Sequence, residues 1–555
     1  DLAAYMQTVH VAGAVGAVSN LGTISEIRLD DGGTIGNGSL ADAAAYARIV
    51  DVKGAAGAVS NFGTMLQVTL EASGSVTNGG SIEGISLFLG GTVINGSAAD
   101  TGAQVASIAA QGAAAAVTNF GTIGYGVELA GGGSITSTGS IAGGVRLDLG
   151  GAVTNGSASA TTARITGTIG VYSQYAATTV TNFGSILGSD FAGVFLSAGG
   201  NVTNGSASDT AATISGGYGV YAGPVAAVTV TNFGTLKGTG GFAAYFGSAA
   251  DQLNVEAGST FLGAIQGGGG TLNLASGTGT LSAMTSTGNV TVSGSMATTT
   301  FRNFGTLEIA AGASFSDSGP AVVATGHALI DSGTAILGGA GVNSIVNNGL
   351  IEAAGTLTLA GAVRNAGTLE AQSGVMTVSG VVSGTGSVII DDGVADFTST
   401  FSQNVAFAAG STGLLELSHS LTYRGTVAGL SLSGANALDL GDVAFGVATH
   451  ATFAGTAAGG TLTVTDGTHV ARIRLAGDYL GSTFTVSSDG HGGTTVVDPA
   501  AKRGSSLPHI PLAAAMAGFG ATAGGATETT APAWREGRPL LALAGVRGAE
   551  ALSSD

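Results

Sequence analysis

The segment VTNFGTI, residues 117–123, decides the fold, because near copies of it recur along the chain. Each copy places an asparagine before an aromatic residue or leucine, then a glycine and a threonine or serine. The other copies are VSNLGTI (18–24), VSNFGTM (59–65), VTNFGSI (180–186), VTNFGTL (230–236) and FRNFGTL (301–307). Recurrence of this kind indicates a repeat architecture, in which each residue of the motif has a stacking or bending role.

A second set of asparagines, each directly followed by glycine, alternates with the first. Its members are Asn37, Asn78, Asn95, Asn155 and Asn204. The intervals from Asn20 to Asn119 are 17 or 24 residues, and those from Asn155 to Asn232 are 22 to 28 residues. A unit of about 20 residues, built from short apolar runs and Gly turns, is typical of a β-solenoid.

The residues between the turns favour strands over helices. Runs such as AVTVT (227–231) alternate apolar and polar side chains with a period of two. Frequent Gly pairs would destabilise a helix. We therefore expect an all-β fold, a right-handed parallel β-helix with one unit per coil, in which roughly 16–20 coils stack about 4.8 Å apart.

Equivalent residues of successive coils lie above one another in such a stack. Each stacked asparagine amide can then bond to the next, and the glycine allows the bend with positive φ. The aromatic residues are expected to form a stack of their own. The bend interrupts strand alternation, so the pattern leaves open whether Asn or Phe points inward. The predicted ladder residues are Asn20, Asn61, Asn119, Asn182, Asn232 and Asn303, with Phe62, Phe120, Phe183, Phe233 and Phe304.

The composition restricts the classes of function. The chain has 555 residues, 99 of them glycine, and a net charge of −18 with only 9% charged residues. It offers no basic face to nucleic-acid phosphates, so we expect no nucleic-acid partner. It contains no cysteine, which excludes disulfides and thiolate metal sites. The most apolar late stretch, 510–526, is shorter than a membrane helix requires, so no transmembrane segment is expected.

Three short loops resemble one another and carry an aspartate: NGSLAD (37–42), NGSAAD (95–100) and NGSASD (204–209). Stacked loops of this kind could bind calcium. An Asx-type turn with a solvated aspartate explains them more simply, and we favour it. No cofactor is expected.

The alternation of VTNFGTI and GGxVTNGS segments resembles the passenger regions of bacterial autotransporter and filamentous-haemagglutinin-type adhesins, especially repetitive ones from α-proteobacteria. The stretches 251–282 and 345–374 are similar to elements of such passengers, with Asn348-Gly349 and Asn365-Ala366-Gly367 in the ladder role. The resemblance covers most of 1–400. It implies a secreted repeat protein at the surface of a Gram-negative bacterium.

Four regions are expected along the chain. Residues 1–250 form a β-solenoid with the clearest repeats, and 251–400 continue it with more degenerate ones. The pattern changes near residue 400, and 460–499 are richer in aromatic and charged residues, with hairpin turns at Asp466-Gly467 and Asp489-Gly490. Residues 401–500 are interpreted as a small all-β cap. Residues 501–555 are interpreted as a tail or linker.

The sequence has few residues in the patterns that catalysis requires. The seven histidines form no HExxH-like pair, and His469 and His491 beside their Asp-Gly turns are interpreted as turn residues. The pairs Arg28/Asp30 and Arg146/Asp148 are interpreted as surface decoration. We expect no enzyme, but an extracellular structural rod, a surface adhesin or a self-assembling fibre or layer subunit. A carbohydrate-active enzyme and a glycan-binding adhesin are the alternatives, and self-association or surface glycans are the expected partners.

Overall fold

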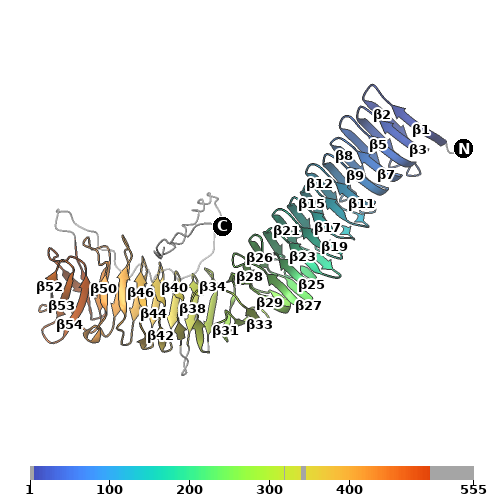
Figure 1. Ribbon diagram of the computed structural model, residues 1–555. Coiled ribbons are helices and arrows are strands. Elements are labelled where there is room, and N and C mark those ends of the chain that lie inside the picture. The colour runs from blue at the N-terminus through green and yellow to red at the C-terminus, as the bar shows by residue number, and fades with distance from the viewer. Residues whose placement is uncertain (1–4, 318, 339–344, 500–555) are drawn as a thin grey trace, which may run out of the picture. The chain divides into compact units, whose positions relative to one another are not determined.

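The computed structural model describes residues 5–317, 319–338 and 345–499, which form a β-solenoid of about 20 turns (Figure 1). The predicted all-β fold of parallel, stacked strands is confirmed. Within the described ranges, the single helical element is a short 3-10 turn, η1 (Ser420–Thr422). The expected tail, 501–555, lies outside the described residues.

Two long sheets, here called sheet A and sheet B, run along the first half of the solenoid. Every coil contributes one strand, or one interrupted strand, to each sheet. Sheet A contains β1 (Tyr5–Val11), β3 (Thr23–Leu29), β5 (Tyr46–Val52), β7 (Thr64–Leu70), β9 (Ser81–Leu87), β11 (Gln104–Ala110), β13 (Thr122–Ile123), β14 (Val127–Leu129), β16 (Ser140–Ile141), β17 (Val145–Leu147), β19 (Arg164–Gly167), β20 (Val171–Ser173), β22 (Ser185–Gly188), β23 (Ala192–Leu196), β25 (Thr213–Ala222) and β27 (Thr235–Phe246).

Sheet B is built from five-residue strands, most of which end on an asparagine. They are β2 (Gly16–Asn20), β4 (Gly33–Asn37), β6 (Gly57–Asn61), β8 (Gly74–Asn78), β10 (Gly91–Asn95), β12 (Ala115–Asn119), β15 (Gly133–Ser137), β18 (Gly151–Asn155), β21 (Thr178–Asn182), β24 (Gly200–Asn204) and β26 (Val228–Asn232).

Alternation within these strands decides which side chains fill the core. In β6, Val59 and Asn61 are buried, whereas Ala58 and Ser60, which alternate with them, face outward. The asparagine therefore shares the inward face with the valine, which resolves the question that the sequence left open. Val, Ile and Leu at equivalent positions of successive coils form one continuous hydrophobic core, and burial of this apolar surface stabilises the stack.

The second half keeps the two sheets, with an irregular segment first. Three strands, β31 (Thr278–Ser282), β32 (Val290–Gly294) and β33 (Thr299–Arg302), pair antiparallel with one another. Sheet A continues with β29 (Thr260–Gln266), β35 (Ser314–Asp317), β38 (Thr334–Leu337), β41 (Thr356–Leu359), β44 (Val375–Val378), β47 (Val394–Phe397), β49 (Leu414–Leu417) and β51 (Ala437–Leu440).

Sheet B also continues through the second half with parallel strands. Between residues 321 and 383 the coils contribute strands to a third, four-stranded sheet. The sheet B strands are β28 (Gln252–Val255), β30 (Thr271–Leu274), β34 (Thr306–Ile309), β37 (Ala328–Asp331), β40 (Leu350–Ala353), β43 (Thr368–Ala371), β46 (Ser387–Ile390), β48 (Asn404–Phe407) and β50 (Thr426–Ala428). The third sheet contains β36 (Ala321–Val323), β39 (Ile345–Asn347), β42 (Val363–Asn365) and β45 (Val382–Ser383).

A cap of mostly antiparallel strands covers the last coil. On sheet B, β54 (Val470–Ala476) itself pairs parallel with the last coil's strand, β50, and is followed outward by β53 (Gly459–Thr465) and β52 (His450–Thr456). On sheet A, β56 (Thr494–Val497) pairs with β51, and β55 (Thr485–Ser488) pairs with β56. The hairpin turns at Asp466-Gly467 and Asp489-Gly490 are both present. Parallel coils continue past residue 400 to β51, so the antiparallel part is shorter than the expected 401–500 module.

Candidate functional site

A ladder of side-chain amides runs through the core beneath sheet B. Both sets of asparagines belong to it, because each ends its strand at the same register position. In eight steps of the ladder, Nδ2 of one asparagine donates to Oδ1 of the next at 2.7–2.9 Å, and the rungs are 0–4% exposed. The rungs are Asn20, Asn37, Asn61, Asn78, Asn95, Asn119, Ser137, Asn155, Asn182, Asn204 and Asn232.

The same amide also donates a hydrogen bond within the corner of its own coil, which is the turn between a sheet B strand and the sheet A strand that follows it. In the short corners Nδ2 donates to the carbonyl two residues on, as from Asn61 to Gly63 at 3.0 Å. In the corners with an NGS loop it reaches the carbonyl eight residues on, as from Asn37 to Ala45 at 3.4 Å. One side chain thus joins the ends of two different corners, so loops of different length leave the register of the strands unchanged.

The expected aromatic stack is wrong. Phe62, Phe120, Phe183 and Phe233 are half-buried, and none of the described ring pairs joins two of them. The residue after the asparagine is glycine in the intervening coils, such as Gly79, where an added Cβ would lie 3.1 Å from Cδ1 of Phe62. Successive rings at this corner are two or three coils apart, because glycine or threonine follows the rungs between them, so they are too far apart to stack.

The last copy of the motif, FRNFGTL, departs from the ladder. Asn303 is exposed, has a φ of 55° and follows the antiparallel strand β33. Phe304 is buried against Phe246 and Phe301. A second, shorter ladder forms under the third sheet, where Asn347 donates to Asn365 at 2.7 Å and Asn365 donates to Gln403 at 2.8 Å.

Asn347 therefore holds the ladder position expected for Asn348. The Asn-x-Gly spacing explains this difference, because Asn347 and Gly349 have the same separation as Asn61 and Gly63. In the corners without an NGS loop, the glycine two residues after the rung marks the corner.

A row of aromatic side chains lies on the outward face of sheet A. Tyr172, Phe195, Tyr221 and Tyr245 occupy one register position in four successive coils. Their strand neighbours on both sides are buried, whereas the rings are half-exposed. Three more half-exposed rings, Phe191, Tyr218 and Phe242, pack beside this row. We call these seven residues the aromatic face.

The rings of the aromatic face support one another. Centroids along the row are 5.1 Å apart for Tyr172 and Phe195, 4.9 Å for Phe195 and Tyr221, and 5.2 Å for Tyr221 and Tyr245. Tyr221 and Tyr245 are stacked, with an interplanar angle of 5°. Such packing fixes the side chains before any partner arrives, which lowers the entropy cost of binding.

The repeat pattern of the sequence does not reveal this face. A signal for it exists in Gly-Val-x triplets, whose third residue points outward: Gly126-Val127-Glu128, Gly144-Val145-Arg146, Gly170-Val171-Tyr172, Gly193-Val194-Phe195 and Gly219-Val220-Tyr221. Loops of different length separate the triplets, so their alignment becomes visible only once the coils are stacked.

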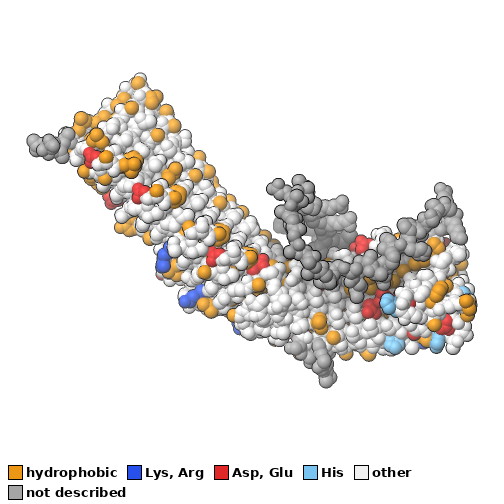
Figure 2. All heavy atoms as spheres, turned by 180° about the vertical axis from the view of Figure 1, so that it is seen from behind, with side chains coloured by type: hydrophobic (Ala, Val, Ile, Leu, Met, Phe, Trp, Pro, Cys, Tyr) orange, Lys and Arg blue, Asp and Glu red, His pale blue; other side chains and the backbone are white. Residues whose placement is uncertain are grey.

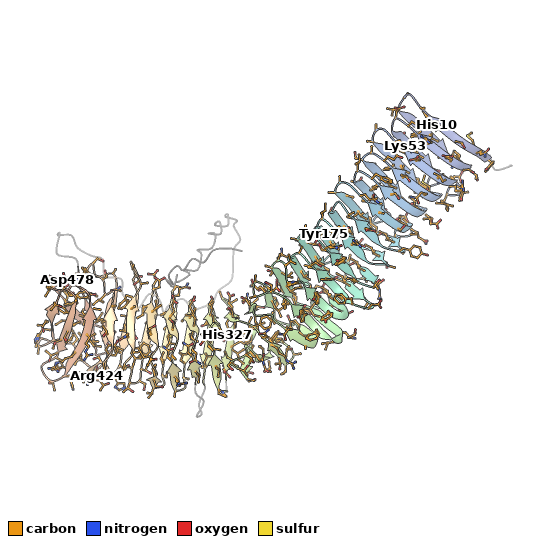
Figure 3. All side chains as sticks on the ribbon, in the orientation of Figure 1. His10, Lys53, Tyr175, His327, Arg424 and Asp478 are labelled. Atoms are coloured by element: carbon orange, nitrogen blue, oxygen red, sulfur yellow. The ribbon has the colours of Figure 1, made fainter. Side chains whose placement is uncertain are left out.

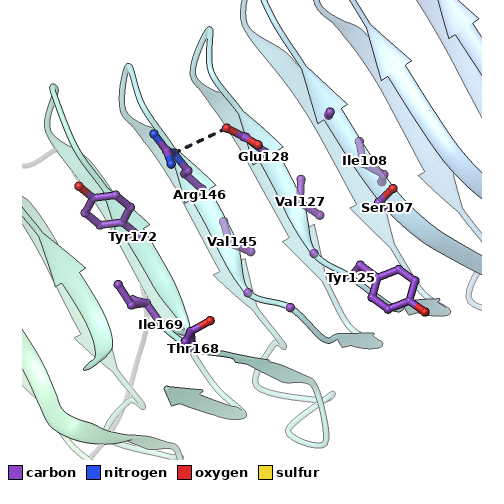
Figure 4. A pocket seen from close by; sticks show the side chains of 14 residues that line it. Ser107, Ile108, Tyr125, Val127, Glu128, Val145, Arg146, Thr168, Ile169 and Tyr172 are labelled. Atoms are coloured by element: carbon purple, nitrogen blue, oxygen red, sulfur yellow. Dashed lines mark ion pairs between the residues drawn. The ribbon is translucent and has the colours of Figure 1, made fainter. Parts of the chain in front are cut away.

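The row continues into a shallow trough at its N-terminal end (Figure 4). The trough has a volume of about 360 Å³, and it lies where the sheet A strands are interrupted between β13 and β14, β16 and β17, and β19 and β20. Gly126, Gly143 and Gly144 line the interruptions with positive φ. Val127 and Val145 contribute buried side chains to the lining, and Tyr125, which is 79% exposed, stands at the edge.

Charged side chains lie at the trough in register with the rings. Glu128, Arg146 and Tyr172 are aligned on β14, β17 and β20. Arg146 Nε lies 2.7 Å from Asp148 and 3.7 Å from Glu128, Nη2 donates to Gln174 at 3.1 Å, and Cζ lies 5.8 Å from the Tyr172 ring centroid.

The hydrogen bond to Asp148 raises the pKa of the Arg146 guanidinium, which stays charged. The Arg28–Asp30 pair also has a 2.7 Å contact. The Arg146 pair differs from it because Arg146 lines the trough.

The other candidate sites have structural roles. Asp466 Oδ1 accepts from the backbone of Thr468 and His469, and Oδ2 lies 2.8 Å from His469 Nδ1, so this pair holds a hairpin turn. The backbone N–H two residues on donates to Asp42, Asp100 and Asp209, which confirms the Asx turns of the NGS loops. The expected solvated aspartate is wrong for Asp209, which is only 8% exposed. Histidines such as His10 and His327 lie far apart along the stack (Figure 3).

Charged side chains are sparse and scattered on the face shown in Figure 2. Over the ranges that the structure describes, no group of three or more His, Asp or Glu is arranged to hold a metal ion, and no helix has the length and hydropathy of a membrane span. Comparison with protein families found no family model that matches this chain, and comparison with curated proteins found no significant match.

Proposed function

We propose that this protein is an extracellular β-solenoid adhesin, which holds a partner against the aromatic face of its sheet A. The observation that carries the proposal is the alignment of Tyr172, Phe195, Tyr221 and Tyr245 on one outward row. Aromatic residues are only 6% of the chain, so seven of them on one patch of a solvent-facing sheet require a reason. Tyrosine and phenylalanine are enriched where proteins bind partners, because they offer large apolar area with few rotamers to fix.

The solenoid supplies a rigid support for this face. Its parallel ladders, continuous core and buried amide rungs keep outward residues of successive coils in line. Ligand contacts along such a surface add up, because neighbouring coils present equivalent positions at the strand spacing.

Two other functions are less well supported. A fibre joined end to end requires open parallel edges, and β54 and β56 cover the edges of β50 and β51. Hydrolysis of a polysaccharide by the usual mechanism requires two carboxyl groups facing each other across the substrate. Glu128 lines the trough, whereas Asp148 is outside its lining and bonded to Arg146. These arrangements favour binding over assembly or catalysis.

The test measures attachment of beads coated with the full chain to surfaces bearing polysaccharide, extracellular-matrix protein or lipid. The variant Phe195→Ser/Tyr221→Ser removes the centre of the row, and Tyr175→Ser, which changes a 66% exposed tyrosine outside the aromatic face, is the matched control. We expect the double variant to lose at least about tenfold in attachment to the surface that the native chain prefers, with the control unchanged. Equal attachment by all three proteins would overturn the proposal.

A further inference from the structure

We infer that the trough beside the aromatic face binds a neutral polysaccharide, whose chain lies along the solenoid axis from the trough onto the rings. This inference rests on the proposed adhesive function and names its ligand class. It concerns residues that no part of the repeat requires, since Glu128, Arg146 and Tyr125 stand at outward or corner positions.

The alignment of the residues sets the direction of the ligand. Glu128, Arg146, Tyr172, Phe195 and Tyr221 follow one another at a single register position, one per coil. The polar trough and the aromatic face therefore form one continuous strip parallel to the axis. A linear polymer can contact the whole strip, whereas a compact small molecule would contact only a part of it.

The chemistry of the strip matches a sugar polymer. Pyranose rings have apolar C–H faces, which pack against aromatic rings, and hydroxyl edges, which bond to carboxylate, guanidinium and amide groups. The trough offers both kinds of contact, with the rings of Tyr125 and Tyr172 in its lining and the 54%-exposed carboxylate of Glu128 at its surface. Arg146, held by Asp148 and Gln174, presents a fixed donor array to adjacent hydroxyls.

The charge balance selects a neutral polymer. Two carboxylates, Glu128 and Asp148, face the single guanidinium of Arg146, and the chain as a whole carries a net charge of −18. A uronate or sulfated polymer would be repelled by the two carboxylates and by the net negative charge of the chain. Hydroxyl groups, which donate to carboxylates as well as accept from guanidinium, carry no such penalty.

The experiment measures retardation of the full chain in native gels containing a neutral β-glucan, a neutral mannan or polygalacturonate. Glu128→Gln and Arg146→Ala alter the trough, Phe195→Ser/Tyr221→Ser alters the rings, and Arg28→Ala is the matched control with the same local ion pair on the same sheet. Circular dichroism establishes that each variant keeps the strand signal of the native chain. We expect retardation by at least one neutral polymer, weakened fivefold or more by each trough variant and by the ring variant, and unchanged by Arg28→Ala.

The outcomes separate this inference from the proposed function. Retardation by polygalacturonate alone, or by a neutral polymer with no effect of either trough variant, overturns the inference and leaves ring-dependent adhesion standing. Attachment of native beads only to protein or lipid surfaces, lost in the ring variant, also overturns the inference alone. If the ring variant matches the native chain on every surface and polymer, the proposed function fails as well.

Discussion

Asn119 donates a 3.0 Å hydrogen bond from its side-chain amide to the hydroxyl of Ser137, the rung at which serine interrupts the run of asparagines. The next rung, Asn155, is fully buried, and its Oδ1 has no hydrogen-bond partner in the described structure. The serine side chain is too short to accept a hydrogen bond from the rung before it and donate one to the rung after it. The chain of hydrogen bonds is therefore interrupted here. A buried acceptor without a donor costs roughly 1–3 kcal/mol.

Replacing this serine is expected to stabilise the protein. In Ser137→Asn the new amide lies in register with Asn119 and Asn155 and supplies the missing donor. We expect the free energy of unfolding of these coils to rise by about 1 kcal/mol, measured by hydrogen exchange of the strand amides of β15 and β18. Slower exchange in the variant supports the ladder. Unchanged or faster exchange contradicts it.

Removing a rung is expected to destabilise the coils on both sides. Asn61→Ala removes the acceptor of the Asn37 amide and the donor to Asn78, at a cost of about 2 kcal/mol or more. Asn303→Gly is the control, because Asn303 is exposed and already has a positive φ that glycine adopts readily. Thermal unfolding followed by circular dichroism should show a lower midpoint for Asn61→Ala only. A similar loss in both variants would mean that the ladder has no special role.

The acidic row near the C-terminal coils predicts a pH dependence. Asp396, Glu416 and Asp439 stack at one register position of sheet A. Burial first, and then the neighbouring carboxylates, raise the pKa of Glu416 to about 7 and that of Asp439 to about 6, while nearby His491 acts in the opposite direction. Because these folded-state pKa values exceed the unfolded ones, the stability that protonation contributes is lost as pH rises through 6–7.

We therefore expect the midpoint of thermal unfolding to be higher at pH 5 than at pH 8. Glu416→Gln, which is neutral throughout, should flatten this dependence. Glu26→Gln, in a coil far from the row, is the control and should leave the dependence intact. A native midpoint that is constant or rises from pH 5 to pH 8 would refute the assignment.

The antiparallel cap is expected to keep the chain from associating. A chain ending at residue 441 lacks β52 to β56 and exposes the parallel edges of β50 and β51. Sedimentation should show concentration-dependent association for this chain, and none for a chain ending at residue 499. If the shorter chain stays monomeric, the cap has a different purpose.

The sequence predicts the coil but not the surface of this protein. The Asn-x-Gly corners reveal the ladder, because polar residues are tolerated in a core only where they bond to one another. They mislead at Asn303, where the antiparallel strands β32 and β33 precede the motif, and at Phe62, whose neighbours along the axis are glycines. The residues of the aromatic face are separated in the sequence by three or four loops of different length. Their alignment on neighbouring coils therefore cannot be read from the sequence.

Hydroxyl-radical footprinting of the full chain, with and without the surface or polymer to which it attaches, tests the central claim most directly. The oxidation rates of Tyr172, Phe195, Tyr221 and Tyr245 are compared with that of the exposed Tyr175 by mass spectrometry. We predict that the four residues of the row become protected together on binding, while Tyr175 is oxidised as before. Binding that leaves the row as reactive as in the unbound chain would contradict the claim that the aromatic face is the adhesive surface.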